Sequence, residues 1–158
     1  MAIGNGIIVS SEPRGVFMEG IISGTPKPGT CMQISAGVEM IGGRFTWVAY
    51  NPDLDGDRRL VCVLLEDRLQ GGLATTAYTS GSQGYLYCPA AGEILNMLLA
   101  DVGGTGDDFA IGDQLMIDDS TGLLIDVTGS MESEPFTCVE TVTDPTADHL
   151  TACMYTGH

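Results

Sequence analysis

The chain is divided into ten short apolar segments, and this division limits what it can fold into. The segments are five to eight residues long, and Gly, Pro, Asn and Asp residues recur between them. Short segments at this spacing are typical of the strands of a barrel or a sandwich. We therefore predict an all-β fold: a small β-barrel, a β-tulip-like domain or a β-sandwich. The ten candidate strands are residues 15–22, 30–35, 45–50, 59–65, 84–88, 94–99, 113–118, 122–127, 136–142 and 149–155.

Hydrophobic patterning within the segments indicates which faces are covered. Residues 45–50 and 150–155 alternate between apolar and polar or small side chains, as a half-buried strand does. Residues 60–65 are almost continuously apolar, which predicts a strand that is covered on both faces. Residues 93–100 have the composition of a helix. They are few, however, and follow a Pro-Ala-Ala-Gly turn, so we expect a strand that returns from residues 85–87.

The first 30 residues differ from the rest because Gly and Pro interrupt them at short intervals. Such a terminus buries little of its own surface, so we expect an extended arm over residues 1–30 and a single β domain over residues 31–158. Within this arm, residues 15–22 are expected to form a strand at the edge of a sheet. The apolar patch at residues 7–9 needs a surface to cover it, either on its own domain or on a partner.

Composition and charge narrow the class of protein. The chain has 158 residues, 44% of them hydrophobic, which suits one globular domain and excludes disorder. No apolar run approaches the roughly 20 residues that span a bilayer. The net charge is −15 and is unevenly distributed: all six basic residues lie in residues 1–68, whereas residues 69–158 carry thirteen acidic ones. This balance argues against nucleic acid and anionic membrane surfaces as partners.

The five cysteines, Cys31, Cys62, Cys88, Cys138 and Cys153, lack the spacing of a metal site. Four of them lie in apolar stretches, so we expect small buried hydrophobic side chains in a reducing compartment. The N-terminus lacks the basic and apolar regions of a signal peptide. The sequence thus predicts a protein that is made in a cytoplasm-like environment.

Candidate chemistry is sparse. Asn51, Asp53 and Asp55 resemble the start of a calcium loop, but the twelfth position is Cys62, and Arg58 and Arg59 follow directly. An ordinary hairpin turn explains this loop better. The acidic residues at positions 107–119 are expected to form solvated turns. No hydrolytic triad or phosphate-binding loop is recognisable, so we expect no enzymatic activity, no metal and no cofactor.

Residues 109–124, Phe-Ala-Ile-Gly-Asp-Gln-Leu-Met-Ile-Asp-Asp-Ser-Thr-Gly-Leu-Leu, combine a Gly-Asp start, an alternating strand and a Thr-Gly corner. This hairpin resembles those of the capsid decoration (cement) proteins of tailed bacteriophages. Residues 24–30, 61–64 and 89–93 are similar in kind. The likeness is spread thinly over residues 20–155.

The resemblance implies a non-enzymatic structural virion protein. It would be made in the host cytoplasm, bind the outer surface of the phage head and cement major capsid protein subunits together, as a homotrimer or homodimer. Its N-terminal segment would supply the interface, which we assign to Ile3, Ile7, Ile8, Val9, Arg14, Phe17 and Lys27. Residues 1–68 would face the shell, and residues 69–158 would face solvent.

Two alternatives remain open at this point. The first is another phage structural or assembly protein, such as a head fibre base or a tail component. The second is a carbohydrate- or ion-binding β module, which Trp47, Tyr50 and the loop at residues 51–57 suggest. Trp47 lies in an alternating strand, where a tryptophan is more often part of a core than a stacking platform.

Overall fold

The protein is all-β, as predicted, and each of the ten predicted strands is present. A computed structural model describes residues 6–9, 12–35, 43–50, 61–67, 72–100, 108–118, 120–126, 136–143 and 149–157. No helix occurs among these residues, and hence none that is suited to crossing a membrane. The strands are β1 (Val16–Ile22), β2 (Cys31–Ile34), β3 (Thr46–Ala49), β4 (Cys62–Leu64), β5 (Gln83–Cys88), β6 (Ile94–Leu98), β7 (Gln114–Ile117), β8 (Leu124–Asp126), β9 (Phe136–Cys138) and β10 (Leu150–Tyr155).

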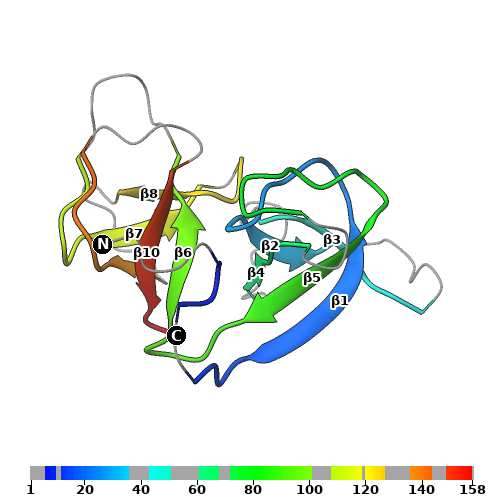
Figure 1. Ribbon diagram of the computed structural model, residues 1–158, viewed down its shortest axis with the longest axis horizontal. Coiled ribbons are helices and arrows are strands. Elements are labelled where there is room, and N and C mark those ends of the chain that lie inside the picture. The colour runs from blue at the N-terminus through cyan, green and yellow to red at the C-terminus, as the bar shows by residue number, and fades with distance from the viewer. Residues whose placement is uncertain are drawn as a thin grey trace.

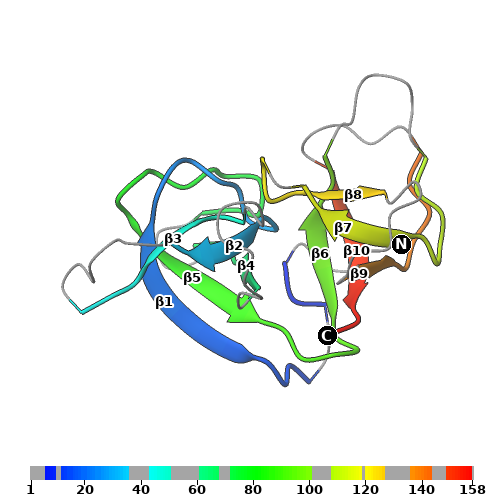
Figure 2. The same cartoon turned by 180° about the vertical axis from the view of Figure 1, so that it is seen from behind.

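The strands form two adjoining bodies. The first five close into a barrel in the order β1-β3-β2-β4-β5, and the last five form a sheet in the order β6-β10-β9-β7-β8. Figure 1 shows the barrel on one side and the second sheet on the other, and Figure 2 shows the same division from behind. Among the pairings of these ten strands, β1 with β3 is parallel and the others are antiparallel. Residues 94–98 pair with β10, so the predicted strand is confirmed over the helix.

Two hydrophobic cores share the strands β2, β4 and β5. Successive side chains on a strand point to opposite faces. On β4, Val63 therefore joins the core beside the second sheet, while Cys62 and Leu64 fill the barrel. On β5, Tyr87 and Leu86 divide in the same way. The described part of the apolar run at residues 60–65 is therefore covered on both faces, as its sequence predicts.

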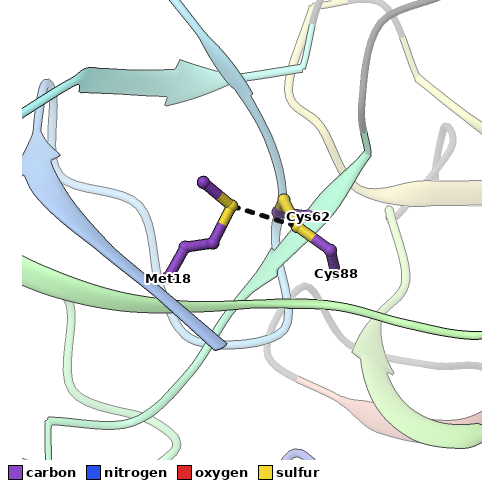
Figure 3. Close-up of a disulfide and its surroundings, with 3 residues drawn as sticks. All are labelled: Met18, Cys62 and Cys88. Atoms are coloured by element: carbon purple, nitrogen blue, oxygen red, sulfur yellow. Dashed lines mark hydrogen bonds between the residues drawn. A yellow bond between two sulfur atoms is a disulfide. The ribbon is translucent and has the colours of Figure 1, made fainter. Parts of the chain in front are cut away.

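The barrel contains a disulfide between Cys62 and Cys88. Figure 3 shows it beside the Met18 side chain, whose sulfur lies 3.6 Å from the Cys88 sulfur. Cys62 and Cys88 are buried, as expected, but they are joined rather than being the reduced side chains of a reducing compartment. The two residues are 26 apart in sequence, and only the register of β4 against β5, in which Val63 faces Tyr87, brings them opposite one another. Cys31, Cys138 and Cys153 are free and buried, as predicted.

The segment expected to form an N-terminal arm has several structural roles. Val16–Ile22 is a barrel strand that pairs with β5 on one side and, through Ile21 and Ile22, with β3 on the other. Residues 6–9 run beside β6, where Ile8 bridges to Leu95. Much of the described part of residues 1–30 therefore packs on the protein itself.

The Thr-Gly corner of the β7–β8 hairpin joins the second sheet to the barrel. Gly122 has a φ of +73°, and its carbonyl accepts a hydrogen bond of 2.8 Å from the Cys31 N–H. A Cβ atom at Gly122 would lie 2.6 Å from the Cys31 carbonyl oxygen. Both the backbone conformation and the lack of space therefore require glycine here.

We expect Gly122→Ala to lower the free energy of unfolding by about 2–4 kcal/mol, because it combines left-handed strain with a backbone clash. Gly112→Ala is the matched control: Gly112 has a φ of +97°, but a Cβ atom added there would meet nothing within 4 Å. The control should lose only about 1–2 kcal/mol. Urea denaturation of both variants measures the difference, and equal losses would contradict the junction assigned to Gly122.

Candidate interface at the start of β1

The residues predicted to form the interface do not lie on one surface. Ile3 is outside the described residues. The Ile7 side chain is completely buried in the core beside the second sheet. Ile8 and Val9 are half-buried along β6, and the Val9 N–H donates a hydrogen bond of 3.1 Å to the Ile94 carbonyl. The chain itself therefore covers Ile7 completely and Ile8 and Val9 in part, whereas Arg14 and Phe17 are exposed.

A buried carboxylate fixes the chain just before β1. Glu93 is 1% exposed and follows the turn between β5 and β6. It accepts hydrogen bonds from the Tyr87 hydroxyl at 2.7 Å, from the Ala90 N–H at 2.6 Å and from the Arg14 N–H. The Arg14 guanidinium also donates to the Ala91 carbonyl at 3.0 Å. One side chain thus ties the start of β1 to the β5–β6 turn.

Gly15 allows this close approach. Its N–H donates a hydrogen bond of 2.7 Å to the Tyr87 hydroxyl. A Cβ atom at this position would lie 2.2 Å from the Cys88 carbonyl oxygen and 2.6 Å from the Tyr87 ring. A larger residue would push the strand away from Tyr87, so the start of β1 depends on glycine here.

The hydrogen bonds set the ionisation of both side chains. Burial raises the pKa of Glu93, but the hydrogen bonds from Tyr87, Arg14 and Ala90 outweigh it and hold the pKa below its ordinary value. Burial and the neighbouring Glu93 carboxylate raise the pKa of Tyr87 to about 12. Glu93 is therefore an acceptor and Tyr87 a donor at neutral pH.

Apolar side chains are exposed directly after this anchor. Val16 is 62% exposed and Phe17 is 61% exposed. One side of the Phe17 ring packs against Tyr87, with the ring centroids 4.9 Å apart. Phe17 therefore has one face held by Tyr87 and a larger part exposed, which is how an aromatic anchor of a protein–protein contact lies before binding.

Along one edge of β1, the first residues of the strand have no pairing partner among the described strands. β5 pairs with Val16 through Ile21, whereas β3 pairs only with Ile21 and Ile22. The Ile21 N–H donates to the Phe45 carbonyl at 2.9 Å on the β3 side. Because backbone direction repeats every second residue, the N–H and C=O groups of Phe17 and Glu19 point to that same side.

Lys27 lies away from Phe17. It lines an open cleft of about 330 Å³ between the barrel and the second sheet, together with Pro26, Leu98 and Thr121. The structure therefore brings together Arg14 and Phe17 from the predicted set and places Lys27 separately.

The other candidate sites have structural roles or lie outside the described residues. Asn51, Asp53 and Asp55 are among the latter. Asp118 accepts hydrogen bonds from Ser120 and Thr121, and these outweigh the effect of burial and lower its pKa. Trp47 is completely buried inside the barrel. Among the described residues, no three His, Cys, Asp or Glu side chains are grouped so as to hold a metal ion.

Sequence reasoning missed the contributions of Glu93, Tyr87 and Gly15. A charged residue between two apolar strands is a sequence signal for an internal hydrogen-bond network, but its partner Arg14 is 79 residues away. A scan against protein-family models gives no match, and no curated protein matches the sequence.

We expect Glu93→Gln to lower the free energy of unfolding by about 1–3 kcal/mol at pH 7, because charge-assisted hydrogen bonds are lost from a buried site. The native pKa of Glu93 is lowered, so its contribution is complete above the unfolded-chain pKa near 4.5. It disappears as the pH falls through the lower native pKa. The difference between wild type and variant should therefore shrink as the pH falls below the unfolded-chain pKa near 4.5.

Denaturation at several pH values measures this difference. Glu19→Gln is the control, because Glu19 is exposed on β1 and accepts one hydrogen bond of 3.0 Å from Gln83. It should change the free energy of unfolding by less than about 0.5 kcal/mol. A Glu93→Gln effect that is the same at every pH would contradict the role of the carboxylate charge.

Proposed function

We propose that this chain is a capsid decoration protein: a non-enzymatic virion protein that binds the outer surface of a phage head and cements major capsid protein subunits together. The observation that carries the proposal is the pair of exposed apolar side chains, Val16 and Phe17, on a barrel strand held in place by Glu93. The resemblance of residues 109–124 to the hairpins of such proteins supports it. In the fold these residues include the β7–β8 hairpin and its Gly122 corner.

The kind of contact follows from the edge of β1. The backbone groups of Phe17 and Glu19 face the side where β3 does not continue. A strand of a capsid subunit added there would gain main-chain hydrogen bonds, and Phe17 would supply an aromatic anchor. Phe45 is 41% exposed, and its carbonyl accepts from Ile21 beside the same edge, so it extends the apolar surface.

The charge distribution supports an orientation. The described basic residues Arg14, Lys27 and Arg44 all belong to the barrel half of the chain, whereas residues 69–158 contain thirteen acidic residues and neither Lys nor Arg. The barrel would therefore face the shell. The second sheet would face solvent, where its acidic residues keep crowded particles apart through like-charge repulsion.

We expect Phe17→Ser to weaken binding to expanded, undecorated heads by about 10- to 100-fold, because an aromatic anchor at an interface contributes on the order of 1.5–3 kcal/mol. The fold should persist, since the side chain is largely exposed. Sedimentation of the protein with the heads, at increasing protein concentration, measures binding and stoichiometry. Wild-type protein should also raise the temperature at which the heads break open.

Ile111→Ser is the matched control, because Ile111 is 69% exposed but precedes β7 in the second sheet. It should bind as the wild type does. Failure of the wild-type protein to bind heads would overturn the proposal. Equal losses for both variants would contradict the interface at β1, and a loss confined to Ile111→Ser would reverse the orientation.

A further inference from the structure

Two free cysteines in the second sheet lie directly opposite each other. Cys138 on β9 is the register partner of Cys153 on β10, and both side chains are completely buried. The neighbouring pair in this register is Val139 and Ala152. It is a hydrogen-bonded pair, because the Val139 N–H donates to the Ala152 carbonyl at 3.0 Å. Hydrogen-bonded and non-hydrogen-bonded pairs alternate in an antiparallel ladder. Cys138 and Cys153 therefore form a non-hydrogen-bonded pair, in which the Cα atoms approach to about 4.5 Å.

The backbone of Cys138 supports this assignment. Its N–H donates to the Asp113 carbonyl at 2.9 Å, and its carbonyl accepts from the Gly112 N–H at 2.9 Å. Both groups point toward the β7 side and away from β10. The space between Cys138 and Cys153 is therefore left to their side chains. In the reduced state each thiol donates to a nearby backbone carbonyl: Cys138 to Glu140 at 2.9 Å and Cys153 to Thr151 at 3.5 Å.

The disulfide in the barrel occupies an equivalent position. The register of β4 and β5, extended by one residue from Val63 and Tyr87, places Cys62 opposite Cys88. The Leu65 N–H donates to the Tyr85 carbonyl, so Leu65 and Tyr85 form a hydrogen-bonded pair. Hydrogen-bonded pairs recur at every second position of the ladder, and the cysteine pair, three positions further along, is therefore a non-hydrogen-bonded one. The Cα atoms of this pair are 4.2 Å apart. The same geometry that carries a disulfide in the barrel is thus repeated in the second sheet.

We propose that Cys138 and Cys153 form a second cross-strand disulfide when the chain folds in the presence of a small-molecule disulfide. This cross-link would join β9 to β10 as Cys62–Cys88 joins β4 to β5. The proposal is independent of the function proposed above, because it rests only on strand register, backbone hydrogen bonds and the burial of the two side chains.

The chemistry is a two-step thiol–disulfide exchange. The Cys138 thiolate attacks one sulfur of the small disulfide, whose S–S bond breaks and releases one thiolate. The Cys153 thiolate then attacks the Cys138 sulfur and releases the second. The two cysteines lose two electrons, the small disulfide gains them, and the two thiol protons pass to the released thiolates. Both sulfurs are buried in the native protein, so the exchange belongs to folding, before the strands are fully packed.

Cys31 is the third free cysteine, and it has no cysteine opposite it on the neighbouring strand β4. It begins β2, where its register partner is Val63, and its backbone bonds to Gly122 and Tyr50. Burial raises its pKa well above the ordinary value, so the thiol stays protonated. We expect Cys31 to remain free when the pair is oxidised.

The test is a map of the cysteines after refolding the full chain from denaturant with reduced and oxidised glutathione. After acid quenching, free thiols are alkylated, and peptides are identified by mass before and after reduction. We expect one linked peptide pair with Cys62 and Cys88, a second with Cys138 and Cys153, and alkylation of Cys31 alone. Alkylation of Cys138 and Cys153 alongside an intact Cys62–Cys88 link would overturn the proposal, as would a link from either residue to Cys31.

Matched variants give a second measurement. Cys31→Ser should keep both links, whereas Cys138→Ser should leave Cys153 alkylated. Closing a loop of 15 residues stabilises a fold of this size enough to shift the melting temperature by roughly 5–10 °C. After oxidative refolding, the melting temperature of the wild type should therefore exceed that of Cys138→Ala by about this amount more than it does when both proteins are reduced. A difference that is the same in both conditions would contradict the cross-link, and if the variants do not fold, the wild-type map still decides.

Discussion

The structure depends on barrel strands that are buried on both faces. β4 and β5 form one wall of the barrel and also the surface on which the second sheet packs, so their side chains divide between the two cores. A slip of one residue would exchange Leu64 with Val63 and Leu86 with Tyr87, and both cores would then hold side chains of the wrong shape. The register of these two strands is therefore the constraint from which the rest follows. The Cys62–Cys88 disulfide joins the same two strands and holds that register.

The side chains of the candidate interface are held in place by β5. Tyr87 reaches out of β5 to hold Gly15 and Glu93, and the ring of Phe17 rests on it. The exposed side chains of β1 are thus placed by a buried network rather than by the surface itself. Preorganised side chains lose little entropy on binding, which favours an anchor at Phe17 over one in a freely moving arm.

Much of the fold can be predicted from the sequence, because turn residues and alternation are local signals. They locate all ten strands, and the apolar run at residues 60–65 correctly indicates a strand with two covered faces. The partners of the strands cannot be predicted in this way: the parallel contact of β1 with β3 and the pairing of β6 with β10 depend on residues far apart in the chain. For the same reason, the Cys62–Cys88 disulfide and the contact of Glu93 with Arg14 leave no local signal. Apolar character alone also cannot separate Ile7, which is buried, from Phe17, which is exposed.

The two bodies are joined by backbone contacts, and this matters for the proposed function. The Gly29 N–H donates to Leu64 of the barrel while its carbonyl accepts from Leu98 of the second sheet, and the Gly122–Cys31 hydrogen bond forms a second link. A load that reaches β1 from a capsid subunit would pass through β5 and the Glu93 network into β6 and through these two links. Main-chain contacts buried between packed sheets yield less readily than side-chain contacts at a wet surface. The strength of such a cement would therefore be limited by the contact at β1 rather than by the junction within the protein.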